Sequence, residues 1–156
     1  MKKCLILFAL FVACLWAKAQ SVVPQVNENV ELMSILSRMA GFPEYNMDMA
    51  GRYIKDMDNY FKDNTEHPAV HYMKELRNKY GISYDAVMSM AVHLDNRNGT
   101  LSLIEEVTPN LDDRWTDVDK DEFLSCLNSF YKDTKFNEFF KSQKDIYNSS
   151  LNISLA

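Results

Sequence analysis

The sequence predicts a mainly α-helical domain, an irregular bundle of about six helices with room for one short β-hairpin. Three observations lead to this fold class. Apolar side chains recur with the period of an α-helix in six separate stretches. Asparagine, proline, glycine and threonine stand where helices ordinarily begin and end. No fixed-period repeat or low-complexity block interrupts this pattern in the sequence.

Residues 1–19 have the composition of a secretory signal peptide. Two lysines precede an apolar run from Cys4 to Trp16, and Ala17-Lys18-Ala19 fits a cleavage site. The run is shorter than the roughly 20 apolar residues that span a membrane. We therefore expect export, to the periplasm or out of the cell, with cleavage near Ala19 and no stable membrane insertion. Lipidation at Cys14 is the weaker alternative, because Phe11 suits a lipobox poorly.

The chain that follows the expected signal is acidic. It keeps 14 of the 17 basic residues and all 22 acidic ones, a formal charge of −8, so we expect no binding to nucleic acid. Cys126 is its only cysteine, which excludes an intrachain disulfide and suits a core position. About 137 residues correspond to one domain. We expect a tether at 20–27, the helical domain at 28–148 and a weakly structured end at 149–156.

The first two helices are expected at 28–40 and 51–63. Asn27 can cap the first helix, and Gly41 ends it. The segment between them, 42–50, carries more methionine and aromatic residues than a solvated linker would. We expect this loop to pack onto the core.

The third and fourth helices form an expected hairpin from Glu66 to Leu94. Pro68 is a favourable first helical residue, and Gly81 suits the left-handed position after a helix end. Ser83 is the expected cap of the fourth helix, which is apolar most of the way round. We expect this fourth helix to be the buried centre of the domain.

The second half of the chain is expected to contain a turn, an extended segment and two helices. The turn falls at 95–100, and we prefer an extended conformation over a short helix for 101–107. Helices are expected at 118–132 and 135–148, the second capped by Thr134 and carrying an aromatic stripe.

Two of the three histidines, His67 and His71, are spaced four apart like a zinc-binding pair on one helix face. However, His67 falls at the cap position just before Pro68, no glutamate follows either histidine, and no third ligand is evident. The sequence therefore favours capping and surface roles over a metal site.

Asp117, Asp119 and Asp121 match the opening of a calcium-binding loop. The match then fails, because Glu122 stands where such a loop needs glycine and Asn128 where it needs glutamate. We interpret these acidic residues as favouring the start of the next helix.

A ligand cleft is the remaining candidate site, formed by His93, Tyr84, Arg114 and Trp115. All four are expected next to loops, where binding residues concentrate. For His93 the simpler interpretation is stabilisation of a helix end or a hydrogen bond to a carbonyl. The sequence contains none of the common hydrolase, phosphate-binding, redox or zinc-protease motifs, so no cofactor and no catalytic residue are assigned.

Several short motifs in order along the chain resemble a known family: NENVELMSILSRMAG at 27–41, YN at 45–46, HPAV at 67–70, GISYDAVMSMAVHL at 81–94, RW at 114–115 and LNSFYKDTKFNEFF at 127–140. They resemble the N-terminal part of a family of exported bacterial proteins that is described as a domain of unknown function. Longer members of that family carry a zinc-metallopeptidase-like HExxH segment further along.

This sequence stops at Ala156 without the HExxH segment. The resemblance therefore implies a truncated product or a stand-alone helical region that is inactive alone. It would serve as a scaffold or interaction module for a polypeptide partner or a missing C-terminal region. The alternative is an independent exported module that binds a small ligand.

Overall fold

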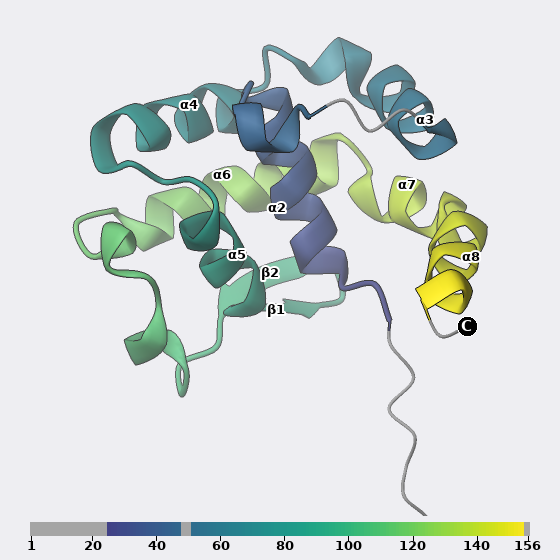
Figure 1. The fold of residues 1–156 in the computed structure, drawn as a ribbon. Coiled ribbons are helices and arrows are strands. Elements are labelled where there is room, and N and C mark those ends of the chain that lie inside the picture. The colour runs from purple at the N-terminus through teal and green to yellow at the C-terminus, as the bar shows by residue number, and fades with distance from the viewer. Residues whose placement is uncertain (1–24, 48–50, 155–156) are drawn as a thin grey trace, which may run out of the picture.

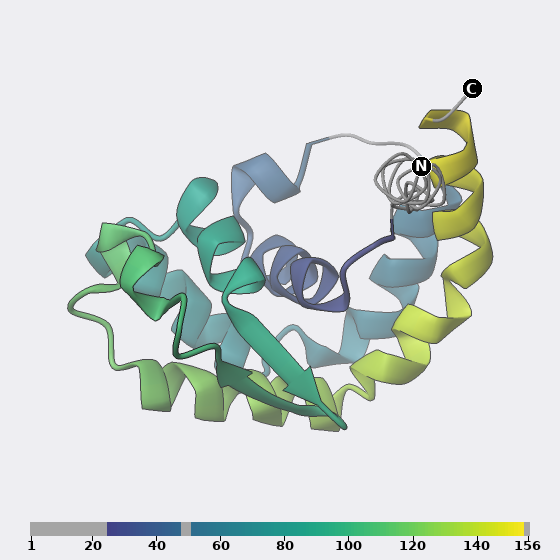
Figure 2. The same ribbon diagram turned by 90° about the horizontal axis from the view of Figure 1, so that it is seen from below.

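Helix α2 (Glu28–Met39) lies in the middle of the structure, and the other elements are arranged around it (Figures 1 and 2). The structure is a computed structural model that describes residues 25–47 and 51–154. The Asn27 side chain accepts hydrogen bonds from the amides of Asn29 and Val30, which confirms the expected cap. Gly41 follows the helix with a φ of 79°, in the left-handed region expected there.

Six further helices follow α2 in the described residues, and α4, α5 and α7 contact it directly. They are α3 (Arg52–Phe61), α4 (Pro68–Tyr80), α5 (Asp85–Val92), α6 (Lys120–Asp133), α7 (Phe136–Ser142) and α8 (Lys144–Ser154). Short 3₁₀ turns occur at Pro43–Tyr45 (η1), Lys62–Asn64 (η2), Thr108–Asn110 (η3) and Asp113–Trp115 (η4). The predicted mainly α fold class is confirmed.

A two-stranded antiparallel hairpin, β1 (Leu94–Arg97) and β2 (Thr100–Leu103), follows α5. Asn98 and Gly99 form its turn with φ values of 55° and 80°, the backbone that a two-residue hairpin loop requires. The short hairpin is thus confirmed. Its first strand falls in the stretch expected to be only a turn, and its second strand ends before the predicted limit at 107.

The element at the centre of the domain is α2 rather than α5. Helix α5 spans only eight residues and buries Ala86, Val87, Met90 and Ala91, but Val92 is 57% exposed. The expectation that the fourth helix is the buried centre is therefore wrong. The apolar character of α5 reflects one deeply buried face and one partly exposed end.

The helix expected at 135–148 is two helices that meet at Gln143. Thr134 does not cap the start of α7. Its hydroxyl donates to the Phe130 carbonyl, 2.7 Å away, so it closes the end of α6 instead. Helix α8 continues to Ser154, into the stretch that was expected to be weakly structured.

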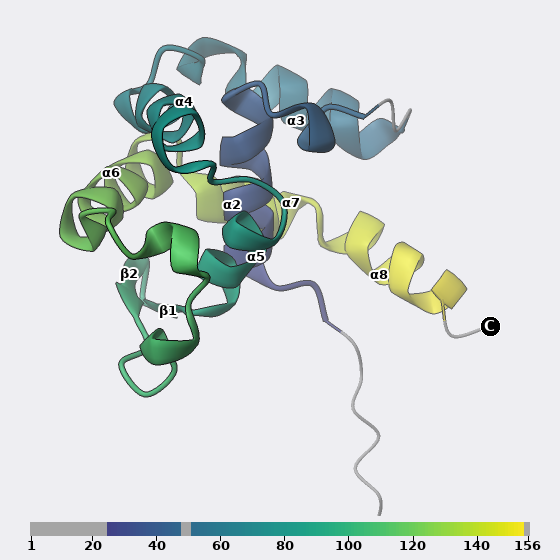
Figure 3. The same ribbon diagram turned by 60° about the vertical axis from the view of Figure 1, so that its left-hand side comes forward.

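Aromatic side chains join α3 and α8 to the rest of the bundle. Phe61 of α3 lies 6.1 Å from Phe130 of α6 and 5.0 Å from Phe139 of α7, measured between ring centroids. Tyr147 of α8 contacts Tyr53 of α3 and Phe140 of α7. Figure 3 shows α8 extending away from the central bundle beyond α7.

The expected signal peptide and residues 20–24 of the expected tether lie outside the described residues. Among the helices that the structure describes, none combines the length and the apolar character needed to cross a membrane.

Candidate functional site

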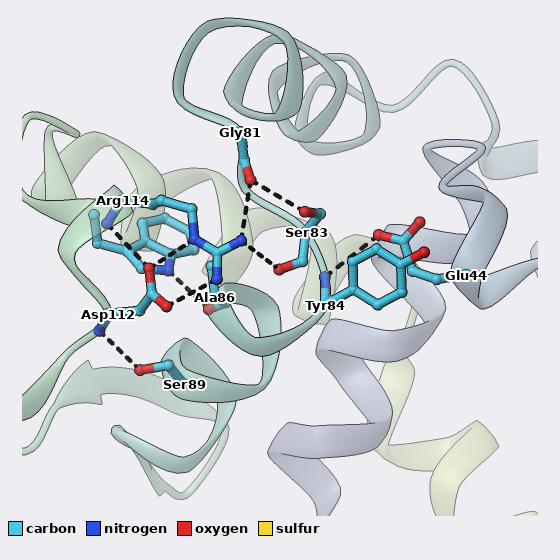
Figure 4. A network of polar contacts seen from close by, with 9 residues as sticks. Glu44, Gly81, Ser83, Tyr84, Ala86, Ser89, Asp112 and Arg114 are labelled. Atoms are coloured by element: carbon cyan, nitrogen blue, oxygen red, sulfur yellow. Dashed lines mark hydrogen bonds and ion pairs between the residues drawn. The ribbon is translucent and has the colours of Figure 1, made fainter.

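The turn between α4 and α5, which carries Tyr84, lies against η4, which carries Arg114 and Trp115 (Figure 4). His93 lies at the other end of α5, as the residue that follows its last turn. These three residues thus lie on two neighbouring segments, but the Tyr84 ring lies beside Glu44, on the other side of the turn from the Arg114 guanidinium (Figure 4). Their contacts decide what this group can do.

Arg114 forms a clamp between η4 and the α4–α5 turn. Its Nε and Nη2 each donate to Asp112 at 2.8 Å. Its Nη1 donates to the carbonyl oxygens of Ser83 at 3.2 Å and Gly81 at 3.4 Å. The hydrogen bonds from Arg114 lower the pKa of the Asp112 carboxyl to about 2. A guanidinium offers five N–H donors. Arg114 uses most of them in hydrogen bonds within the chain, so few remain for a ligand.

Trp115 is an anchor of the core. The indole is fully buried, its Nε1 donates to the Ala86 carbonyl at 2.8 Å, and its ring lies 4.8 Å from the Phe123 ring. The buried indole N–H is therefore satisfied within the chain. The ring positions η4 against α5 and is not available to a ligand at the surface.

Tyr84 has an unusual backbone conformation, with φ at 41° and ψ at −112°. The Ala86 amide donates to the Ser83 carbonyl at 3.0 Å, which closes a turn with Tyr84 as its second residue. These angles match that position of a type II′ turn, where glycine is strongly preferred. Tyr84 is nonetheless 60% exposed.

The expected cap of α5, Ser83, does not act as one. Its hydroxyl donates to the Gly81 carbonyl at 3.1 Å, and α5 begins after Tyr84 with no side-chain cap. The Tyr84 amide instead donates to Glu44 Oε1 at 3.3 Å. The start of α5 is thus held by Glu44 of η1, 40 residues away in sequence, and not by the predicted cap Ser83.

Glu44 holds the other side of the Tyr84 turn. Its side chain is only 4% exposed, and Oε1 also accepts from Arg77 Nη1 at 2.6 Å. Burial alone would raise the pKa of Glu44, but the hydrogen bonds from Arg77 and from the Tyr84 amide lower it below the usual value. The ionised carboxylate is therefore the form that supports the turn.

His93 is buried and its Nδ1 lies 2.7 Å from the Ser89 carbonyl, so this nitrogen carries the proton. The interpretation of His93 as a helix-end residue that donates to a carbonyl is confirmed. The Ser89 hydroxyl in turn accepts from the Asp112 amide at 3.0 Å. His93 therefore stabilises the end of α5, at the opposite end of that helix from Tyr84.

The other two histidines have separate structural partners. His67 Nδ1 accepts from the Ala69 amide at 3.1 Å, and its Nε2 lies 3.2 Å from Asp133, so the capping interpretation is confirmed. His71 Nε2 lies 3.0 Å from Glu66. Within residues 25–47 and 51–154, no group of three or more His, Cys, Asp or Glu side chains is placed to hold a metal ion.

Asp119 caps α6, since its Oδ1 accepts from the amides of Asp121 and Glu122, each at 3.0 Å. This confirms the interpretation of the acidic run as a helix start. Cys126 packs against the core, and burial raises the pKa of its thiol. A thiol with a raised pKa is a poor nucleophile.

Two hollows that the sequence did not reveal lie elsewhere on the described surface. One, of about 610 Å³, is lined by polar residues of α2, the hairpin, α6 and α7. The other, of about 320 Å³, lies beside Glu31 and Tyr53 between α2 and α3. Their lining residues are far apart in sequence, and only the Asn98-Gly99 turn gave a local signal.

These contacts define a small helical domain in which histidine, arginine and tryptophan side chains support the internal structure. The chain belongs to a family described as a domain of unknown function, DUF4932, whose profile matches residues 22–153. The resemblance to a family of unknown function is thereby confirmed. No curated protein matches the chain. No solved structure matches it either.

Proposed function

We propose that this chain is a non-catalytic binding domain that docks onto a second polypeptide through Tyr84 and the clamped turn around it. The partner is the HExxH-containing, metallopeptidase-like region that the family resemblance implies. The proposal places the complex outside the cytoplasm, because residues 1–19 have the composition of a signal peptide. The observation that carries it is an exposed tyrosine held in a conformation that suits glycine.

The backbone strain at Tyr84 is not explained by the fold alone. A residue other than glycine in such a region costs about 1–3 kcal/mol, and residues of this kind cluster at functional sites. The Tyr84 ring gains little from burial within the chain, because it is 60% exposed. Tyrosine is among the residues that contribute most to protein–protein affinity when a partner buries them.

The turn is held on both sides before any partner binds. Arg114 binds the carbonyl of Ser83, and Glu44 binds the amide of Tyr84 itself. A preorganised loop loses little conformational entropy on binding, which favours affinity. Tyr84 therefore has the properties of a binding anchor.

The chemistry of the partner follows from the charges next to the ring. Asp85 is exposed and makes no hydrogen bond with its side chain to the described residues, and the chain after residue 19 carries a formal charge of −8. A complementary surface has an apolar pocket for the phenol ring and a basic side chain for Asp85. We expect the metallopeptidase-like region to present both.

The test is isothermal titration of this chain with a purified HExxH-containing region from a longer family member. The wild-type chain should form a one-to-one complex, and Tyr84→Ala should weaken it at least tenfold. Val92→Ala is the matched control, because Val92 is also exposed but lies at the far end of α5. It should bind like the wild type.

Absence of a complex with the wild-type chain, or equal binding by Tyr84→Ala, would refute the proposal. The isolated chain should also fail to cleave casein, with or without added zinc. Cleavage that resists removal of contaminating proteases would show a catalytic site instead.

A further inference from the structure

A hollow of about 610 Å³ lies between the hairpin turn, the start of α2 and the α6–α7 junction (Figure 2). Ligand pockets in proteins typically have 300–1,000 Å³. Its lining is polar: Glu28, Asn96, Asn98, Gly99, Tyr131, Asn137 and Lys141. None of these residues takes part in the Tyr84 network.

One wall of the hollow is a preformed hydrogen-bond network centred on Glu28. Its Oε1 accepts from the Tyr131 hydroxyl at 2.7 Å and from Asn137 Nδ2 at 3.0 Å. Asn96 Nδ2 donates to the Tyr131 oxygen at 3.3 Å. The Glu28 carboxylate is thus oriented by Tyr131 and Asn137, with Asn96 behind Tyr131, and its Oε2 remains free to accept from a ligand.

The opposite wall, the hairpin turn, is held at a fixed distance from α6. The Asn128 side chain pairs with both backbone groups of Leu101, accepting from its amide at 2.8 Å and donating to its carbonyl at 2.9 Å. A Cβ atom on Gly99 would lie 3.3 Å from the Tyr131 ring, so glycine permits the close approach of the turn. Both walls are therefore set before a ligand enters.

The lining carries one negative and one positive group. Glu28 is its only acidic residue and Lys141 its only basic one, with the three asparagine amides and a phenol as the other polar groups. The side chains of Asn98 and Lys141 make no hydrogen bond or ion pair with the described residues. A ligand that matches this lining has a cationic donor, an anionic group and neutral polar groups between them.

We propose that this hollow binds a short zwitterionic peptide of two or three residues. Its ammonium group lies at Glu28 and its carboxylate at Lys141, and the side-chain amide of Asn98 pairs with its backbone. The volume exceeds the needs of a single amino acid, which favours a short peptide. This proposal is independent of docking through Tyr84.

The probe is trialanine, titrated into the whole chain by calorimetry, with alanine, N-acetyl-trialanine, trialanine amide and cellotriose as comparison ligands. Trialanine should bind, and blocking either end should weaken binding about tenfold. Alanine should bind more weakly than trialanine. No binding of trialanine at millimolar concentration, equal binding of the blocked peptides, or preference for cellotriose would overturn the proposal.

Two variants test which side chain binds which end of the peptide. Glu28→Gln keeps the shape of the side chain and can still accept from Tyr131, so it should fold. This variant should bind trialanine and N-acetyl-trialanine with the same affinity. Lys141→Gln, at an exposed position, should abolish the difference between trialanine and its amide. If either variant still binds trialanine more tightly than the blocked peptide by the wild-type factor, the proposed contact between that side chain and that end of the peptide is wrong.

A third variant, Asn98→Gly, removes an amide from the lining while keeping a residue that accepts the positive φ of the turn. It should weaken trialanine binding severalfold with little change in melting temperature. Unchanged affinity would contradict a role for the hairpin turn in the site.

Discussion

Replacing Tyr84 by glycine is predicted to stabilise this domain, although it removes a large side chain. Tyr84 occupies a backbone conformation with φ at 41° that glycine adopts without strain. Relief of that strain is worth about 1–3 kcal/mol. Glycine also increases the entropy of the unfolded chain, which removes about 0.5–1 kcal/mol of this gain.

The net expected change is an increase of about 1 kcal/mol in the free energy of unfolding, because the mostly exposed ring contributes little to the fold. For a domain of this size that corresponds to about 4 °C in melting temperature. Urea denaturation followed by circular dichroism measures the change.

Tyr84→Ala is the matched control, since alanine removes the ring but keeps the Cβ atom that causes the strain. We expect it to be no more stable than the wild type. At an ordinary position glycine is less stable than alanine by about 0.5–1 kcal/mol, whereas here the order should be reversed. If the glycine variant is less stable than the alanine variant, the turn is not strained as described.

Three further changes test the surrounding contacts. Trp115→Phe should lower the free energy of unfolding in urea by about 2 kcal/mol, because it leaves the buried Ala86 carbonyl without the indole N–H and opens a small cavity; a loss below 0.5 kcal/mol would contradict its role as an anchor. Hydrogen bonds from Arg114 lower the pKa of Asp112 from 3.8 in the unfolded chain to about 2 in the folded domain. The ionised carboxylate therefore stabilises the folded state at any pH above 3.8, and this stabilisation is lost as the pH falls toward 2. The stability difference between wild type and Asp112→Asn should therefore be constant above pH 5 and shrink below pH 4, and a flat difference down to pH 2 would count against the clamp. Burial raises the pKa of Glu31 in the folded domain above 4.5. The protonated side chain therefore stabilises the fold at low pH, and this stabilisation is lost as the pH rises through the pKa of the folded state. Glu31→Gln should accordingly gain stability relative to wild type between pH 4 and pH 7 in urea titrations, and the opposite trend would show that its carboxylate is well solvated.

The helix starts and stops that depend on adjacent residues were predictable from the sequence. Asn27 caps α2, His67 caps α4 and Gly81 ends α4 with a φ of 70°, as their chemistry indicates. Each of these features is formed by a side chain or backbone angle within three residues of the helix end. Local propensity is sufficient for such contacts.

Other boundaries depend on contacts that the local sequence does not reveal. Asp95 and Asn96 are unfavourable in strands, yet β1 forms because pairing with β2 satisfies its backbone. The aromatic stripe continues from Phe139 to Tyr147, which concealed the break at Gln143 between α7 and α8. In both cases tertiary packing outweighs the local pattern.

The candidate site was predictable only in part. The sequence places Tyr84, Arg114 and Trp115 next to loops, and the structure puts them on two neighbouring segments. Their roles follow from partners that are distant in sequence: Glu44 lies 40 residues from Tyr84, and the Ala86 carbonyl lies 29 residues from the Trp115 indole. Spacing along the chain carries no information about such pairs.

Hydrogen–deuterium exchange of this chain, with and without the HExxH-containing region, tests the proposed docking surface most directly. Complex formation should slow exchange in the peptides that cover 82–86 and 44–46 and leave exchange in α8 unchanged. Slower exchange confined to α8 or to the hairpin, or no change anywhere in the presence of saturating partner, would contradict it.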